Sequence, residues 1–461
     1  MTNWRNRFGN VSITKANVLL LLLGTASLVV YRTGLKANGT ENISWFIKLA
    51  LGQAAIYLAA ACLVFHTRSS RSTLLLVIVF AILFRLSIVF SPPQLSDDIY
   101  RYIWDGRVQA AGINPYRYVP AAEELAHLRD TTIYPRINRR DYANTIYPPV
   151  AEALFFLTTR LSESVTWMKL TMLGFELVAA WVIAQLLVSF GLPPQRLVMY
   201  AWHPLIVWEF AGSGHVEAIA IAFITLALLA HRRQVNVAAG AVLACATLVK
   251  LFPLVLFPAV YKRWSWKMPF AFALTIILAY LCYLSVGPMA VLGFLPGYAQ
   301  EQGLVNGEQF YLLSLVRIIL GPNVPATAFL IFVVIAMGAI AIWALRTDDK
   351  PEGIIIGPVI LATTTTVLFA PHYSWYFAWL VPFLCFKPHV SLLYLTIASF
   401  ALYLTWLGDS PAQMFRINSF IYLPFVLIAG VELWVRHRKS HRASNQVRTT
   451  RMSDSLEGTK R

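Results

Sequence analysis

Long apolar blocks, separated by short polar segments, run along most of this chain. Many of them approach or exceed the roughly 20 residues that an α-helix needs to cross the hydrocarbon core of a bilayer. The pattern predicts an all-α integral membrane protein, built as a multi-pass helical bundle. The expected spans lie near residues 17–31, 44–65, 72–90, 167–190, 197–211, 215–231, 235–260, 268–287, 325–346, 353–370, 374–386, 390–407 and 418–436.

The polar segments between these spans indicate how the bundle is oriented. Lys and Arg are enriched in cytoplasmic loops, which places the N-terminus and segments 66–71, 262–267 and 436–461 in the cytoplasm. Arg32 and Lys36 are exceptions to this assignment. The formal net charge of +16 is concentrated in such loops and in the tail, so it orients helices and does not indicate a nucleic-acid partner.

Each crossing must change the side of the membrane, and this condition decides two ambiguous segments. Residues 147–161 are short, contain two prolines at the start and carry Glu152, so we expect an interfacial or re-entrant helix there. Residues 235–260 have basic segments at both ends and a break at Lys250–Pro253, which predicts a helical hairpin with Lys250 near its turn. The scheme gives twelve crossings and this hairpin.

The composition supports a single membrane body, because 58% of the 461 residues are hydrophobic and only 13% are charged. We expect that body over residues 1–437 and a basic cytoplasmic tail without regular structure over 438–461. The cysteines lie inside apolar stretches without CxxC spacing, so they are interpreted as packing residues rather than as disulfide or metal ligands.

Four polar segments emerge on the side opposite to the basic loops, which is the external side. They are the loop 91–147 after the third helix, the turn Gly212–Glu217, the loop 288–324 and the turn Pro371–Tyr376. A connection as long as 91–147 usually has local structure or a function. We therefore expect the functional site on the external face.

The external loop opens with the stretch SDDIYRYIWDGR, whose charged residues follow a helical spacing. In a helix over Asp97–Val108, the side chains of Asp98, Arg101, Tyr102 and Asp105 share one face. A solvated surface helix with local ion pairs is the alternative interpretation. The interleaved aromatic residues and the position just beyond an apolar span favour a functional site at the membrane interface.

Further ionisable residues lie within the apolar spans or at their ends. His215 and Glu217 are at the outer end of neighbouring spans, Lys250 is flanked by apolar residues, and His372 stands among aromatic residues. Ionisable groups at such depth are costly and are functional candidates by default. The alternatives are mutual pairing among His203, Glu209, His215 and Glu217, snorkelling of Lys250 to an interface, and an interfacial position for His372.

Several kinds of chemistry find no support in the sequence. It contains no P-loop, no glycine-rich nucleotide loop before a helix in an αβ context, and no HExxH or other zinc-binding spacing. ATP-driven transport and chemistry on nucleotide sugars therefore lose support, and no metal site is expected.

The order of four motifs resembles the GT-C superfamily of multi-pass glycosyltransferases, which use polyprenyl-phosphate sugars. The motifs are SDDIYRYIWDGRVQAAGINPYRY, YPPVAEALF, HPLIVWEFAGSGHVEA and ATLVKLFPLVLFP. The chain is most similar to bacterial polyprenol-phosphate-mannose-dependent mannosyltransferases of the kind grouped in glycosyltransferase family 87. The motif-bearing half covers residues 72–260, whereas residues 268–436 resemble these enzymes only in hydropathy. The helices 17–31 and 44–65 precede the motif-bearing helix, which is the first helix in many GT-C enzymes.

The resemblance implies a catalytic carboxylate directly after a membrane helix, which here is Asp97 or Asp98. We favour Asp98 because Arg101, Tyr102 and Asp105 follow it at helical spacing. The carboxylate would act as general base on an acceptor hydroxyl that attacks the anomeric carbon and inverts it. No cofactor is implied, and a divalent metal is not needed, although Asp98 and Asp105 could bind one.

The leaving polyprenyl phosphate gains negative charge, which fixed cations would stabilise. The candidate cations are Arg101, Arg107, Arg117, Lys250, His215 and His372, and Tyr102, Asp105 and Glu217 complete the implied substrate-binding residues. Lys250 with one arginine of the loop is the favoured pair for the phosphate. His215 and Glu217 would hold sugar hydroxyls or orient the acceptor.

The implied function is inverting transfer of a sugar, with mannose favoured, from a polyprenyl phosphate to a glycolipid, glycan or protein acceptor. The implied location is the bacterial cytoplasmic membrane, with the active site on the external side. A flippase or transporter of polyprenyl-linked glycans is one alternative, but such proteins usually show internal repeats and charges at the bilayer midplane. A ligase or polymerase of lipid-linked polysaccharide is the other, and it would use a similar donor.

Overall fold

The computed structural model describes residues 14–36, 42–93, 95–262, 264–308, 310–347 and 353–458. All regular structure within these ranges is helical, which confirms the all-α prediction. The longer helices of the N-terminal part are α1 (Lys15–Gly34), α2 (Ile43–His66), α3 (Arg71–Ile88), α6 (Val165–Ser189), α9 (Glu217–Arg232), α10 (Asn236–Thr247) and α12 (Lys267–Leu281). Those of the C-terminal part are α15 (Ala326–Thr347), α16 (Gly353–Phe369), α18 (Val390–Ala398) and α19 (Pro411–Gly458).

Polar caps directly before apolar runs explain where several of these helices begin. The hydroxyl of Thr14 accepts a hydrogen bond from the backbone N–H of Asn17 at the start of α1. The hydroxyl of Ser70 accepts the N–H of Thr73 in α3, and Ser164 has the same role in α6. Each cap satisfies an N–H group that the helix itself leaves without a partner.

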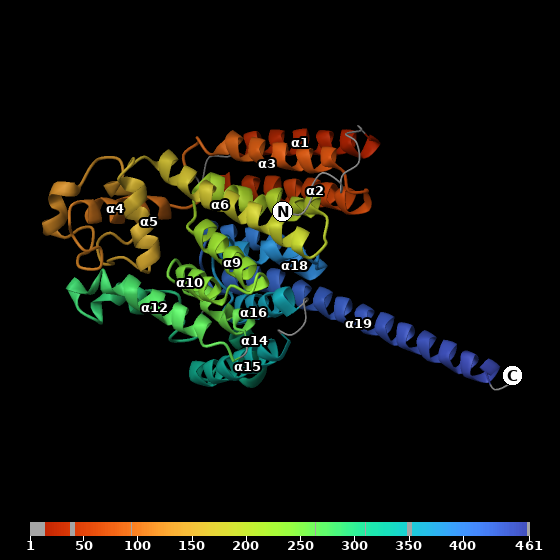
Figure 1. Ribbon diagram of the computed structural model, residues 1–461. Coiled ribbons are helices and arrows are strands. Elements are labelled where there is room, and N and C mark those ends of the chain that lie inside the picture. The colour runs from red at the N-terminus through yellow and green to blue at the C-terminus, as the bar shows by residue number, and fades with distance from the viewer. Residues whose placement is uncertain are drawn as a thin grey trace.

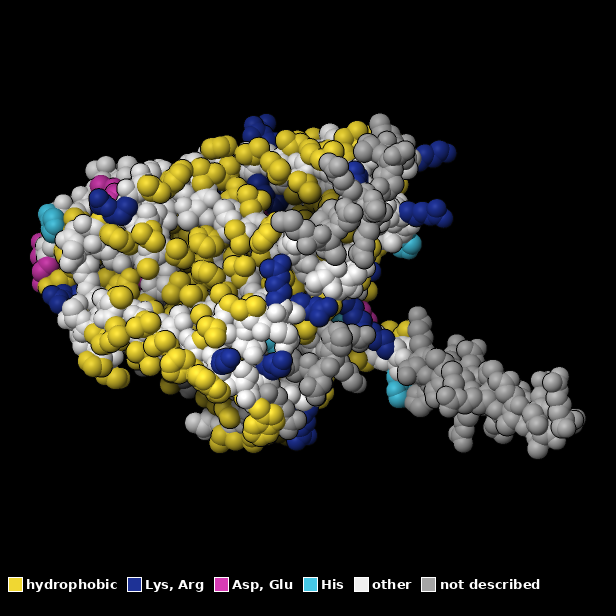
Figure 2. All heavy atoms as spheres, in the orientation of Figure 1, with side chains coloured by type: hydrophobic (Ala, Val, Ile, Leu, Met, Phe, Trp, Pro, Cys, Tyr) yellow, Lys and Arg dark blue, Asp and Glu magenta, His cyan; other side chains and the backbone are white. Residues whose placement is uncertain are grey.

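The helices form one bundle with a separate layer at one end. Helix α1 packs on α2 and α3, while α6 packs on α9, α9 on α10, and α10 on α12. Figure 1 shows α4 (Asp98–Ala110) and α5 (Pro149–Thr159) together beyond one end of this bundle, away from the C-terminal helix α19. On the face drawn in Figure 2, hydrophobic side chains cover the flanks of the bundle. Acidic side chains on that face lie mainly at the end that holds α4 and α5, whereas most Lys and Arg side chains lie toward the opposite end.

Seven helices in the described part of the chain are long and apolar enough to cross a membrane. They correspond to seven of the twelve crossings that we expected. The segments that correspond to the expected crossings 197–211, 215–231, 268–287, 353–370 and 374–386 are helices shorter than 18 residues or broken segments. Helix α5 has 11 residues and packs on α4, which agrees with a segment that does not cross.

The expected continuous span 197–211 is wrong, because the chain is broken there by proline. Helix α7 (Val198–Ala201) ends before His203, which is extended because Pro204 follows it. Helix α8 (Pro204–Ile206) is then followed by the π-helical segment η6 (Val207–Ser213). Gly214 ends that segment with a φ of 77°, in the left-handed region that favours glycine.

Of three other segments, one agrees with the expectations and two differ from them. The break in 235–260 is present: α10 is followed by the short elements η7 (Phe252–Leu256) and α11 (Phe257–Val260), with Lys250 between. The expected loop 288–324 contains two helices, α13 (Leu295–Glu301) and α14 (Tyr311–Leu320). The basic tail, for which we expected no regular structure, continues helix α19 to Gly458.

Candidate functional site

A cavity of about 430 Å³ lies where the expected external segments meet. The external loop 91–147, helix α13 and the turn after α16 all contribute to its wall, together with Lys250. The lining residues are Leu95, Ser96, Asp97, Asp98, Asn138, Arg139, Tyr142, Ile146, Tyr147, Lys250, Tyr298, Glu301, Tyr373, Trp375, Tyr376 and Trp406. Three of the four polar segments singled out in the sequence therefore surround one space, and the fourth lies behind it.

Asp98 stands at the first turn of α4 and points its carboxylate into the wall of this cavity. The hydroxyl of Ser96 accepts the backbone N–H of Asp98 at 3.2 Å, so the helix begins at Asp98, one residue later than expected. The side-chain amide of Asn138 donates to Oδ1 of Asp98 at 2.8 Å. A carboxylate held in this way is oriented before any substrate arrives.

Asp97 lines the same cavity but is an exposed residue. Partial burial of its carboxyl group and the adjacent charge of Asp98 raise the pKa of Asp97, and the nearby Arg136 opposes them. The two neighbouring aspartates thus differ in environment. Asp98 accepts a hydrogen bond from Asn138, whereas Asp97 is more exposed and its pKa is raised by the negative charge of Asp98.

Lys250 reaches the cavity from the break after α10. Its Nζ lies 2.6 Å from Oε1 of Glu217, which is at the start of α9, and 3.3 Å from the hydroxyl of Tyr376. The same ammonium group stands 4.4 Å from the centre of the Tyr376 ring. The hydroxyl groups of Tyr376 and Tyr298 are 2.9 Å apart, so a polar chain connects Lys250 to α13.

A second cation, Arg139, lines the cavity and was not among the candidates. Its Nε lies 2.6 Å from Oε2 of Glu301, and its guanidinium group stands 5.6 Å from the centre of the Tyr298 ring. The residue has a φ of 54°, an uncommon backbone conformation for a residue other than glycine. Its sequence, INRRDYAN, distinguishes it only as one of several arginines in the loop.

His215 and Glu217 do not line the cavity, but they contact residues that do. The ring of His215 stacks on Trp375, with ring centres 4.1 Å apart and an angle of 21° between the planes. Its Nε2 lies 3.3 Å from Oε2 of Glu209, and both side chains are almost completely buried. The alternative interpretation of mutual pairing therefore holds for His215, whose partner is Glu209, whereas Glu217 pairs with Lys250.

Arg101, Tyr102 and Asp105 lie on the buried side of α4 rather than in the cavity wall. Nε of Arg101 lies 2.8 Å from Oδ1 of Asp105, and the ring of Tyr102 stacks on Phe155 of α5 at 4.6 Å. The predicted common face of α4 exists, but only its first member, Asp98, reaches the cavity. Tyr102 packs α4 on α5, and Nη1 of Arg101 donates to the carbonyl oxygen of Ala143 in the external loop.

Glu152 extends this buried support. It accepts hydrogen bonds from the hydroxyl of Thr145 at 2.6 Å and from the side-chain amide of Gln109 at 2.9 Å. Burial and the neighbouring Asp105 raise the pKa of Glu152, and burial raises the pKa of Asp105 while the adjacent Arg101 opposes that shift.

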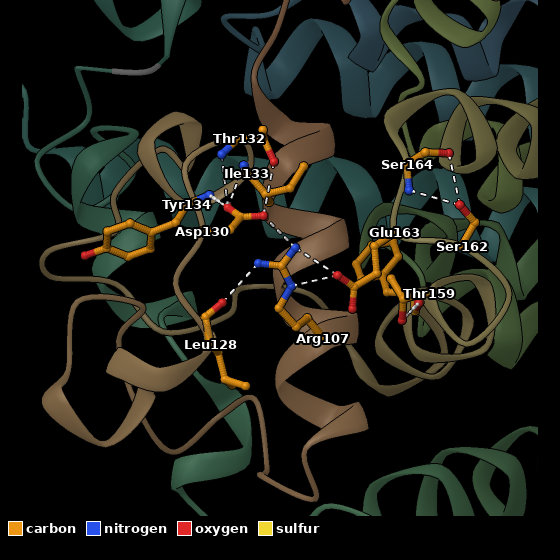
Figure 3. Close-up of polar contacts among 11 residues, drawn as sticks. Arg107, Leu128, Asp130, Thr132, Ile133, Tyr134, Thr159, Ser162, Glu163 and Ser164 are labelled. Carbon is orange, nitrogen blue, oxygen red and sulfur yellow. Dashed lines mark hydrogen bonds and ion pairs between the residues drawn. The ribbon is translucent and has the colours of Figure 1, made fainter.

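Arg107 points away from the cavity and stabilises the external loop. As Figure 3 shows, its guanidinium group bridges two acids, with Nη2 2.9 Å from Oδ2 of Asp130 and 2.8 Å from Oε2 of Glu163. Asp130 also accepts the backbone N–H groups of Ile133 and Tyr134. The resemblance implied a substrate contact for Arg107, whereas its side chain contacts acids of the loop and of the segment before α6 instead.

Arg117 and His372 also lie outside the cavity wall. Arg117 is exposed, and its Nη2 donates to the carbonyl oxygen of Ser285 at 3.3 Å. Burial lowers the pKa of His372 to about 4, so the imidazole is neutral near pH 7 and is not a fixed cation. Neither residue therefore suits the phosphate role for which it was a candidate.

The cavity joins parts of the chain that are far apart in sequence. The backbone N–H of Phe294 donates to the carbonyl oxygen of Thr145 at 3.0 Å, directly beside the cavity. Gly293 has a φ of 55°, and a Cβ atom at this position would overlap that same oxygen. The close approach of the two segments thus requires glycine. Within the described residues, no group of three or more His, Cys, Asp or Glu side chains is placed to hold a metal ion.

Comparisons with known proteins agree with the resemblance noted in the sequence. Residues 9–266 match the family described as alpha-(1→6)-mannopyranosyltransferase, N-terminal domain. The match begins before α1. Helices α1 and α2, which precede the motif-bearing helix and are additional to the pattern of many GT-C enzymes, therefore lie within the region that matches this family.

A curated relative is alpha-(1→6)-mannopyranosyltransferase A of Corynebacterium glutamicum, which is 24% identical over 182 residues. The alignment covers 38% of this chain and 36% of the relative, so the chain matches about a third of the relative's length. No solved structure matches the chain. On the strength of the match over residues 9–266, the chain belongs to the alpha-(1→6)-mannopyranosyltransferase family.

Proposed function

We propose that the protein transfers mannose, with inversion, from a polyprenyl-phosphate donor to an acceptor hydroxyl on the external face of the cytoplasmic membrane. The observation that carries the proposal is the joint presence of Asp98 and Lys250 in the wall of one cavity at the end of a membrane helix bundle. The family and the relative are named for transfer of mannose, which supports mannose as the sugar.

Asp98 is the general base in this proposal. Its carboxylate accepts the proton of the acceptor hydroxyl while that oxygen attacks the anomeric carbon from the face opposite the phosphate. The hydrogen bond from Asn138 occupies one carboxylate oxygen and leaves the other for the acceptor. The bond between the anomeric carbon and the phosphate oxygen breaks, and the polyprenyl phosphate leaves with the electron pair.

Lys250 and Arg139 are the cations that stabilise the leaving phosphate. Each is already paired with an acid, Glu217 or Glu301, which holds its charged group in place before the donor binds. Preorganised charges of this kind stabilise developing negative charge without reorganisation during the reaction. The loop arginine that we expected beside Lys250 is thus Arg139 in this proposal, in place of Arg101, Arg107 and Arg117.

The lipid-linked donor and the external side rest on the placement of the cavity. It lies at the end of the bundle that carries α4 and α5, and the basic segments lie mainly at the other end (Figures 1 and 2). Nucleotide sugars are absent outside the cytoplasmic membrane, so a donor there must be delivered by a lipid that diffuses in the bilayer.

Purified protein supplied with polyprenyl-phosphate mannose and a membrane acceptor tests the proposal. We expect transfer by the wild-type protein and a loss of roughly 10²- to 10⁴-fold in kcat for Asp98→Asn, the range for removal of a general base. Asp141→Asn, which changes an exposed acid of the same loop, is the matched control and should keep full activity. Full activity in Asp98→Asn with loss in Asp97→Asn would move the base by one residue, and no transfer by the wild type would reject the function.

A further inference from the structure

Aromatic side chains of the turn after α16 form one side of the cavity. The rings of Tyr373 and Trp375 are nearly parallel, at 7°, with centres 4.6 Å apart. Tyr376 continues the array, since its ring centre is 6.3 Å from that of Tyr373 and the planes differ by 28°. All three residues line the cavity. We call Tyr373, Trp375 and Tyr376 the aromatic wall.

His215 supports this wall from behind. Its ring lies against Trp375 at 4.1 Å, and its Nε2 faces Oε2 of Glu209 at 3.3 Å. The other oxygen of Glu209 accepts a hydrogen bond from the hydroxyl of Tyr403 at 2.7 Å. Tyr403 also contacts Trp375, at 6.5 Å between ring centres. His215 and Tyr403, which both contact Glu209, therefore also both contact Trp375, from two different segments of the chain.

The local backbone brings His215 to this position. The π-helical segment η6 and the left-handed Gly214 turn the chain immediately before His215. A Cβ atom at Gly214 would lie 2.7 Å from Cδ1 of Ile99, so a larger residue would push against a side chain of α4, the helix that carries Asp98. π-Helical turns are rare and frequently occur at functional sites.

The proposed reaction assigns no step to Glu209 or His215, although burying such groups is expensive unless they are paired. Their contacts end on Trp375, which lines the cavity and is itself stacked on Tyr373. The contacts of His215 and Tyr403 therefore both act to hold the orientation of the Trp375 ring.

We infer that the aromatic wall is the platform on which the mannopyranose ring of the donor stacks, with His215 as a positioning residue for Trp375. This inference rests on the proposed function. One face of a pyranose ring presents mainly C–H groups, which pack well against flat aromatic rings. The donor sugar is assigned here because Tyr376 contacts Lys250, and the sugar is bonded directly to the phosphate that Lys250 binds.

Two variants of His215 test the positioning role. His215→Ala removes the stacked ring and should raise the KM for polyprenyl-phosphate mannose by about 3- to 10-fold, the effect of losing one aromatic contact. His215→Phe keeps a flat ring and should stay within about 2-fold of the wild type. Tyr373→Leu should raise the donor KM as His215→Ala does. In all three variants the KM for the acceptor should be unchanged.

His203→Ala is the matched control, because His203 is equally buried in the same region and bonds to Thr396 instead of the wall. It should lower the unfolding temperature without changing the donor KM. A defect in His215→Phe as large as that in His215→Ala would overturn positioning by stacking. A rise in the acceptor KM alone would overturn the assignment to the donor sugar. Unchanged KM values in His215→Ala and Tyr373→Leu, in a protein whose wild type transfers mannose, would reject this inference and leave the proposed function intact.

Discussion

Replacing Lys250 by methionine should destabilise the protein as well as weaken donor binding, because its ammonium group neutralises the buried carboxylate of Glu217. The two groups are 2.6 Å apart, and their side chains are 12% and 1% exposed. Removing one partner of a buried ion pair leaves an uncompensated charge and costs about 3–5 kcal/mol. Loss of the contact with the Tyr376 hydroxyl, at 3.3 Å, adds roughly 1 kcal/mol.

A second substitution separates the two effects. In Lys250→Met combined with Glu217→Gln, both charges are removed, so most of the lost stability should return. Donor use should stay impaired in the double variant, since the phosphate still lacks its cation. The measurements are the unfolding transition of the detergent-solubilised protein and the KM for polyprenyl-phosphate mannose.

Two results would refute this reasoning. A single variant as stable as the wild type would show that Glu217 does not depend on Lys250 for its charge balance. Recovery of donor use in the double variant would show that Lys250 only neutralises Glu217 and does not bind phosphate.

The remaining predictions concern the external loop. Hydrogen bonds from Arg107 and from the N–H groups of Tyr134 and Ile133 outweigh the effect of burial and hold the pKa of Asp130 well below its usual range. This contribution to stability is complete above about pH 4 and is lost as the pH falls further, so pepsin cleavage of the loop should accelerate there, and Asp130→Asn should remove that dependence. A cysteine at the exposed Ala111 should react with a membrane-impermeant reagent on intact cells, and reaction only after lysis would reverse the proposed sidedness.

The sequence was sufficient for the parts of the site that local spacing determines. The helix after Ser96, the break at Lys250 and the meeting of the polar segments follow from helical periodicity, proline positions and side-of-membrane parity. Periodicity places Arg107 in the helix after Ser96, but it cannot identify Asp130 and Glu163 as the distant acids that the side chain contacts.

Other features depend on contacts between distant segments, so the sequence pattern did not reveal them. Arg139 lines the cavity and has a left-handed backbone conformation. The sequence alone does not distinguish it from the adjacent Arg140, which does not line the cavity. Pro204, three residues before the π-helical segment η6, and Gly214, directly after it, indicate an irregular backbone, but neither residue identifies a π-helix.

The wall of the cavity divides between two stretches of the chain with different relations to the family. Asp98, Asn138 and Lys250 lie within residues 9–266, whereas Tyr298, Glu301 and the aromatic wall lie beyond them. Under the proposed roles, the base and both phosphate contacts, Lys250 and Arg139, lie in the stretch that matches the family, and the surface against the sugar lies outside it. Selection can therefore alter sugar recognition through the C-terminal stretch without disturbing the position of the base. The close approach of Gly293 to Thr145 therefore constrains both stretches at once, as do the contacts of Arg139 with Glu301 and of Lys250 with Tyr376.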